Sequence, residues 1–120
     1  MMEIINLSEK FTRFSDYWNP RIIADLNGQY VKVVKVKGDF IWHSHEQEDE
    51  LFWVNKGTLT MDFRDRSLRI GPGEMIVVPR GVEHRPRAEE EVELLLFEPQ
   101  STRNTGGEEH ALTRKKLERL

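Results

Sequence analysis

The chain has 120 residues and a formal net charge of −3, and it contains no cysteine. With no basic stripe visible along the chain, this composition argues against a nucleic-acid partner, and the lack of cysteine excludes both a disulfide framework and a thiolate metal site. No apolar run approaches the roughly 20 residues of a membrane span, and the first residues lack a secretion signal. We therefore expect one cytoplasmic domain over residues 1–120, with no membrane partner.

The N-terminal segment predicts a short helical turn over residues 8–14. Ser8 suits the N-cap position, and Phe11 and Phe14 lie three residues apart on one side of the turn. The pair Asn19-Pro20 then disfavours any continuation of a helix.

Strand signals follow one another at short intervals after this turn. The predicted strands cover residues 21–26, 30–37, 40–45, 50–55, 58–64, 67–70, 75–78, 83–88 and 92–97. Many short strands separated by turn residues indicate an all-β sandwich or barrel, with a core over about residues 21–98. Polar residues 101–107 then precede a predicted helix over residues 108–120, whose docking the sequence does not define.

Three of the four histidines lie in two of these strand-rich stretches. His43 and His45 are two residues apart, so on a strand both side chains point to the same face. Glu50 offers an oxygen ligand and His84 a third imidazole. Neutral imidazoles with a carboxylate suit one divalent first-row transition metal, and the pattern does not distinguish Fe, Mn, Zn and Ni.

The spacing of these residues resembles the two signature motifs of the cupin superfamily. Residues 43–57 read H-x-H-x4-E-x6-G, and residues 73–84 read G-x5-P-x-G-x2-H. The resemblance covers roughly residues 30–98. Within it the chain is similar to small bacterial cupins of the kind often named mannose-6-phosphate isomerase-like. It implies a double-stranded β-helix, or jelly-roll barrel, with His43, His45, Glu50 and His84 as metal ligands. Gly38 and Ala88 depart from the usual pattern, but neither is a ligand position.

Two other acidic residues, Glu48 and Asp49, are less favoured alternatives to Glu50, because only Glu50 has the motif spacing. His110 has no neighbouring ligand residues and is expected to be solvated.

Candidates for catalysis beyond the metal ligands are few, namely Tyr30, Glu98 and the arginines 80, 85 and 87. The arginines are placed to meet an anionic ligand at the barrel mouth, but we expect them to pair with acidic residues 89–93 on the surface, where such pairs contribute little.

Four protein ligands leave two positions open on an octahedral metal, which suits binding O2 or polarising a carbonyl. The resemblance implies a small metalloenzyme, of the dioxygenase type or the sugar isomerase or epimerase type, acting on a small polar metabolite. We favour this slightly over a non-catalytic module that binds or senses a metal or small molecule. An oxygenase needs a dry, apolar pocket, and the expected lining residues are Ile41, Phe52, Met61, Val77 and Leu96.

Strand alternation also places large apolar residues on the faces opposite the ligands. Phe40 and Trp42 alternate with the two histidines, and Leu51 and Trp53 follow Glu50 in the same way. Because a contiguous exposed apolar patch usually marks an interface, we expect a homodimer. Cover of these residues within one chain, by the N-terminal strand or by the C-terminal segment, is an equally weighted alternative.

Overall fold

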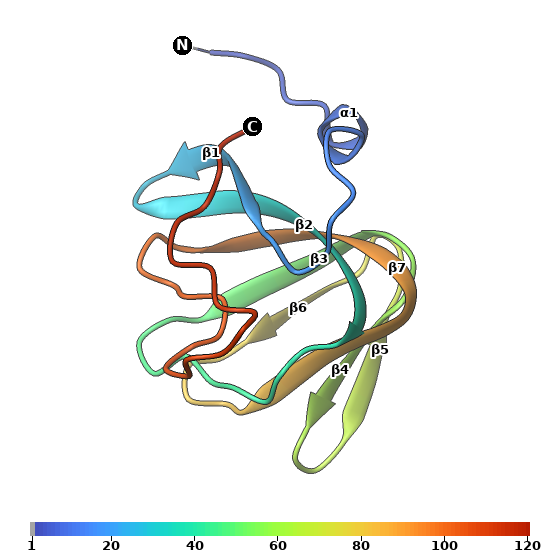
Figure 1. Ribbon diagram of the computed structural model, residues 1–120, viewed down its shortest axis with the longest axis vertical. Coiled ribbons are helices and arrows are strands. Elements are labelled where there is room, and N and C mark those ends of the chain that lie inside the picture. The colour runs from blue at the N-terminus through green and yellow to red at the C-terminus, as the bar shows by residue number, and fades with distance from the viewer. Residues whose placement is uncertain (1) are drawn as a thin grey trace.

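The computed structural model describes residues 2–120, and nearly all of its regular structure is β-strand (Figure 1). One helix, α1 (Leu7–Phe11), precedes seven strands: β1 (Arg21–Leu26), β2 (Gln29–Asp39), β3 (Glu50–Lys56), β4 (Leu59–Phe63), β5 (Ser67–Ile70), β6 (Met75–Val78) and β7 (His84–Pro99). Within the described residues, no helix has the length and apolar character needed to cross a membrane.

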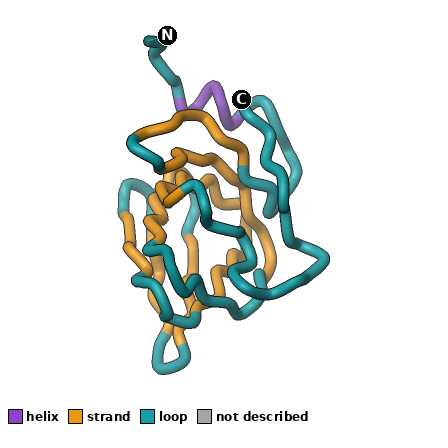
Figure 2. The backbone as a smooth tube through the Cα atoms, turned by 90° about the vertical axis from the view of Figure 1, so that its left-hand side faces the viewer, coloured by secondary structure: helices purple, strands orange, loops and turns teal. Residues whose placement is uncertain are grey.

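The strands form the expected antiparallel jelly-roll barrel, in which β7 joins the two sides. The pairing order is β1-β2-β7-β3-β6, and β4 pairs with both β5 and β7. The first residues of β7 pair with β4, the later residues pair with β3, and β2 runs beside β7 over most of its length. Figure 2 shows these strands around a common interior, with the C-terminal residues running as loop along one side.

The interior is filled by alternate side chains from facing strands. On β3, Glu50, Phe52 and Val54 are buried, whereas Leu51 and Trp53 between them are half-buried on the outer side. This alternation confirms the faces predicted for this strand. The apolar core continues across the barrel through β2, β4 and the second half of β7, where the buried residues include Val36, Met61, Val92 and Leu94.

Two strand predictions are wrong in instructive ways. Residues 40–45 do not form a strand, because only His43 makes a bridge, to His84. Residues 83–88 and 92–97 are not separate strands but parts of β7. Val36 pairs with Val92 and Gly38 with Ala88, so residues 89–91 lie opposite a single residue of β2. Such a bulge lets the strand bend without a turn, which explains why the acidic run 89–91 does not end it.

The helix predictions also need correction. The N-cap of α1 is Asn6, not Ser8, because the Asn6 side chain accepts a hydrogen bond of 3.0 Å from the backbone N–H of Glu9. The predicted pair Phe11 and Phe14 does pack together, over Val33 on the outer face of β2.

Residues 108–120 form turns rather than the predicted helix. The Asn104 side chain donates to the carbonyl of Leu112 and accepts from the backbone N–H of Arg114, at 2.7 and 2.9 Å. Side-chain bonds of this kind compete with helical backbone bonds. The last residues then pair with the edge of β1, since the N–H of Leu120 donates to the Ile22 carbonyl at 3.0 Å.

Candidate metal centre

The four predicted ligands lie together inside the barrel. His43 and His45 come from the irregular segment between β2 and β3, Glu50 is the first residue of β3, and His84 is the first residue of β7. One donor atom from each residue lies within 4.8 Å of every other, and all four side chains are buried.

The two alternative acidic residues do not join this cluster. Glu48 accepts a hydrogen bond from the hydroxyl of Ser101 at 2.7 Å, and exposed Asp49 accepts one from the backbone N–H of Arg80 at 2.8 Å. Glu50 is therefore the acidic residue of the run that faces the histidines.

Backbone contacts orient two of the imidazoles. The Nδ1–H of His43 donates to the Ile41 carbonyl, and the Nδ1–H of His84 donates to the Val82 carbonyl, both at 3.0 Å. Because a carbonyl only accepts, each ring must carry its proton on Nδ1, which leaves the Nε2 lone pair available to a cation. The two rings lie with centroids 4.3 Å apart.

The inner atoms of the cluster are placed so that they could hold a metal ion. The Nε2 atoms of His45 and His84 lie 3.1 and 3.4 Å from Oε1 of Glu50. Despite these short separations, none of the three atoms has a partner in hydrogen-bond geometry among the described residues. Buried polar atoms without partners are rare. Four possible ligand atoms this close together match a cation with ligand distances of about 2.0–2.2 Å.

The protonation states also favour a cation. Burial, followed by the neighbouring His84, lowers the pKa of His43 to about 4, so this imidazole is neutral at neutral pH. Burial raises the pKa of the Glu50 carboxyl, but the adjacent Glu98, His45 and His84 side chains outweigh it and hold that pKa well below its usual range. The centre therefore presents a neutral imidazole at His43 and a carboxylate at Glu50, the forms that metal binding requires.

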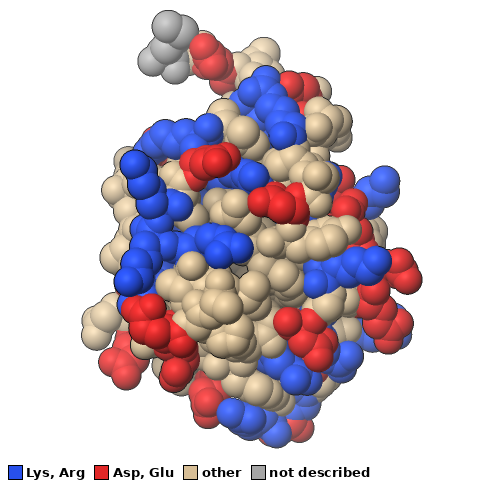
Figure 3. Space-filling model, viewed as in Figure 1, with Lys and Arg blue, Asp and Glu red and all other residues tan. Residues whose placement is uncertain are grey.

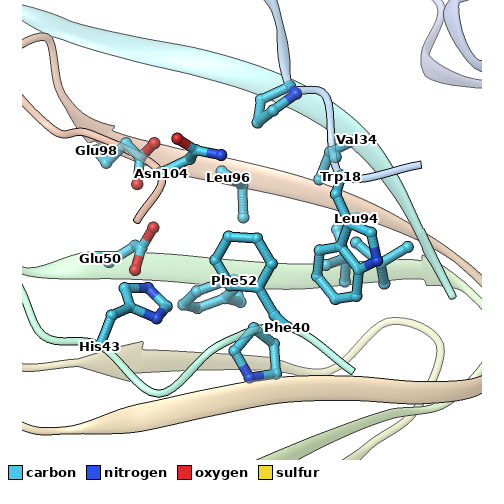
Figure 4. A pocket seen from close by; sticks show the side chains of 13 residues that line it. Trp18, Val34, Phe40, His43, Glu50, Phe52, Leu94, Leu96, Glu98 and Asn104 are labelled. Carbon is cyan, nitrogen blue, oxygen red and sulfur yellow. The ribbon is translucent and has the colours of Figure 1, made fainter. Parts of the chain in front are cut away.

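A buried lysine and a second buried carboxyl lie next to Glu50 of the centre. Lys32 donates to Glu98 at 2.7 Å, and each of these side chains is 2% exposed. In Figure 4 the Glu98 carboxyl faces that of Glu50. Burial and the adjacent Glu50 raise the pKa of Glu98, and they outweigh the opposing effect of Lys32. Glu98 was among the sequence candidates, whereas Lys32 was missed although it alternates with the core-facing Val34 and Val36.

An apolar pocket opens beside His43, Glu50 and Glu98 (Figure 4). Its cavity volume is about 40 Å³, which is room for a few water-sized groups. Its other lining residues are Trp18, Pro20, Val34, Val36, Phe40, Phe52, Pro86, Leu94, Leu96 and Asn104.

Two of the five predicted lining residues, Phe52 and Leu96, line this pocket. The others do not: Met61 is buried in the core, Val77 is 48% exposed on β6, and Ile41 is half-buried outside the lining.

The prediction for Phe40 is wrong, because this ring points toward the pocket. It stacks on Trp18 at 4.8 Å and meets the His43 ring edge-on at 5.3 Å. Residues 40–45 lack strand alternation, so Phe40 need not face away from His43. Trp42 does lie outside, beneath the guanidinium of Arg64 at 3.9 Å. The N-terminal segment therefore covers Phe40 through Trp18, which sequence reasoning did not place at the pocket.

The prediction that the three arginines pair with acidic residues 89–93 is also wrong. Arg85 and Arg87 both donate to Asp62 at 2.8 Å, and not to residues 89–93. Arg80 pairs with Asp49 on the surface. None of the three lines the apolar pocket, and Tyr30 does not line it either. His110 is exposed, as expected, and it is not part of the cluster of possible metal ligands found among the described residues.

Comparisons with known proteins agree with this geometry. The sequence model of the cupin domain family matches residues 30–98. A cupin-2 domain-containing protein from Shewanella frigidimarina NCIMB 400 is 46% identical in sequence, with a TM-score of 0.80 over 81% of this chain and 95% of that one. Protein NMB1881 from Neisseria meningitidis is 39% identical, with a TM-score of 0.74 over 82% of this chain and 100% of that one. The uncharacterized Bacillus subtilis (strain 168) protein YdbB is 31% identical over 83 residues, which is 68% of this chain and 67% of YdbB.

Proposed function

The chain belongs to the cupin domain family, and from this premise we propose that it is a small metalloenzyme of the dioxygenase type. Its substrate is a small molecule with an apolar body and one polar end. A divalent metal held by His43, His45, Glu50 and His84 would supply Lewis-acid or O2 chemistry at the polar end of the pocket.

The observation that carries this proposal is the apolar wall beside the ligands. Nine of the thirteen residues that line the pocket are apolar or aromatic. A sugar would place several hydroxyl groups against this wall without hydrogen-bond partners, and each such group is costly to bury. The wall therefore favours a substrate less polar than the sequence suggested, and a dioxygenase over a sugar isomerase.

The pocket residues have separate tasks in this proposal. Trp18 and Phe40 form a stacked pair that contacts a flat or apolar substrate body and excludes water. Asn104 and Glu98 are the polar side chains beyond the ligands, so they orient the polar end of the substrate (Figure 4). Glu98 in turn faces the Glu50 carboxyl and lowers its pKa (Figure 4).

Substrate-dependent O2 uptake tests this function. Protein loaded anaerobically with Fe(II) is mixed with a panel of small aromatic and branched-chain acids, and oxygen consumption is recorded. We expect at least one compound to stimulate uptake, and we expect zinc-loaded protein and the His43→Ala variant to be inactive. Interconversion of a sugar phosphate without O2 uptake would support the isomerase alternative. Tight ligand binding without turnover would support the non-catalytic module.

We also propose a homodimer, through the outer face of β3, β6 and β7. Leu51 and Trp53 pair across β3 with Val77 and Met75 of β6. These β6 residues are 48% and 59% exposed. Leu95 and Phe97 extend the same face on β7. A second copy presenting the same apolar face would cover it by two-fold symmetry, whereas Phe40 and Trp42 are already covered within the chain.

A further inference from the structure

A second concave surface lies between the C-terminal segment and the strands β1 and β2, and we call it the basic groove. It encloses about 380 Å³. Six cationic side chains and no Asp or Glu line it: Lys32, Arg103, Arg114, Lys115, Lys116 and Arg119. Figure 3 shows Lys and Arg atoms gathered on the left of the face, where Figure 1 places the C-terminal segment.

The positive charge of the groove is not neutralised by its surroundings. Three carboxylates outside the lining pair with four of the cations: Glu98 with Lys32, Glu109 with Arg103 and Lys115, and Asp25 with Arg119. Arg114 and Lys116 have no ion-pair partner among residues 2–120. An excess of positive charge in one concavity is notable in a chain whose net charge is −3, and it attracts anions.

An unsatisfied hydroxyl supports the same conclusion. Thr102 lines the groove and is only 7% exposed. Its Oγ1 has no hydrogen-bond partner among the described residues. A buried hydroxyl normally has a partner, so a ligand in the groove is the natural acceptor of this hydrogen.

The groove is held in shape before any ligand arrives. Asn104 bonds to both Leu112 and Arg114, which fastens the segment that carries the exposed cations. Asn104 lines the groove and the apolar pocket, so it stands between them. Lys32 lines the groove while its ammonium contacts Glu98, which lines the pocket. The two sites are therefore neighbours with different chemistry.

We propose that the basic groove binds a small, multiply charged anion that carries phosphate groups. Arginine forks and lysine ammonium groups supply charge-assisted hydrogen bonds to phosphate oxygens, and the Thr102 hydroxyl adds a neutral donor. Five of the six cations lie within residues 103–119, three of them consecutive at 114–116, and Lys32 of β2 joins them in the folded chain.

Calorimetric titration tests this proposal, with fructose 1,6-bisphosphate and inorganic phosphate as probes at constant ionic strength. We expect saturable binding, tighter for the bisphosphate, in metal-free and in zinc-loaded protein alike, since the groove does not include the metal ligands. The double variant Arg114→Gln/Lys116→Gln should weaken bisphosphate binding by about tenfold or more, as loss of charge-assisted contacts implies. The matched control Lys37→Gln/Lys56→Gln removes the same charge from exposed sites outside the groove and should bind like wild type.

The variant Thr102→Val keeps the side-chain shape and removes only the hydroxyl. It should weaken bisphosphate binding while leaving the melting temperature nearly unchanged. Absence of saturable binding overturns the proposal. So does equal weakening by the control pair, which would mean diffuse attraction, or binding only when metal is present. Tighter binding of a short single-stranded oligonucleotide than of the bisphosphate overturns it in favour of nucleic acid.

Discussion

His43 and His84 exchange both of their backbone hydrogen bonds, at 3.0 and 2.9 Å, although they lie on segments far apart in the sequence. This isolated bridge places two imidazoles side by side without a regular strand on the His43 side. Because backbone pairing and the apolar core hold the ligands, the centre forms as part of the barrel, unlike in a zinc finger, which folds only around its metal.

Acid should destabilise the metal-free protein through His43. The pKa of His43 is lowered from 6.5 to about 4, chiefly by burial, so between these values the unfolded chain binds a proton that the folded chain does not. This contribution to stability is present above pH 6.5 and is lost as the pH falls to about 4, by about 3 kcal/mol. Urea unfolding at neutral pH and near pH 4 measures it. The His43→Asn variant should lose less stability over the same interval, and an equal loss in both proteins would contradict the cause.

The buried pair of Lys32 and Glu98 should show strong coupling. Removing one partner, as in Lys32→Met, leaves the other buried without its contact, and we expect a loss of roughly 3–5 kcal/mol in unfolding free energy. The double variant Lys32→Met/Glu98→Leu should recover much of this loss, because both polar groups are then gone. Denaturant unfolding of the metal-free wild type, the two single variants and the double variant gives the four unfolding free energies that this comparison needs. Additive losses would show that the two side chains do not act as a pair.

Gly106 should be essential to the C-terminal segment, and Gly107 should not. A Cβ at position 106 would overlap the carbonyl oxygen of Ser44, and the φ of this residue is +63°, whereas a Cβ at 107 meets nothing within 4 Å. Gly106→Ala should cost about 1–3 kcal/mol and expose residues 44–48. Gly107→Ala should be nearly neutral. Hydrogen exchange at residues 44–48 distinguishes the pair, and equal protection in both variants would show that the two segments do not depend on each other.

The proposed dimer depends on Trp53 at the centre of the outer sheet face. Trp53→Glu would place a charge in an apolar contact, which is costly without a partner. We expect sedimentation equilibrium to give a dimer for the wild type and a monomer for the variant, with the metal content unchanged. Trp42→Glu is the matched control, because Trp42 lies beneath Arg64 outside this face. A monomeric wild-type protein at high concentration would exclude the interface.

Much of the barrel and the four clustered residues follow from local patterns in the sequence. Period-two alternation placed Glu50 and Phe52 on the buried face of β3. Turn residues on either side gave the bounds of β5 and β6 as the structure has them. The errors occur where tertiary pairing overrides local signals. Residues 89–91 read as a turn, but the neighbouring strand carries them through as a bulge. Asn104 prevents the predicted C-terminal helix by bonding across eight and ten residues, which no local pattern reveals.

The most direct test of the central claim is an anomalous difference map from crystals grown with zinc. We predict one strong peak per chain, with three nitrogen ligands and one oxygen ligand, from His43, His45, Glu50 and His84, at about 2.0–2.2 Å. Crystals of His43→Ala should keep the barrel and lose the peak, because the apolar core does not depend on the metal. A map of the wild-type protein with no peak among these four side chains, or with one of them turned away from a bound ion, would contradict the assignment of this centre.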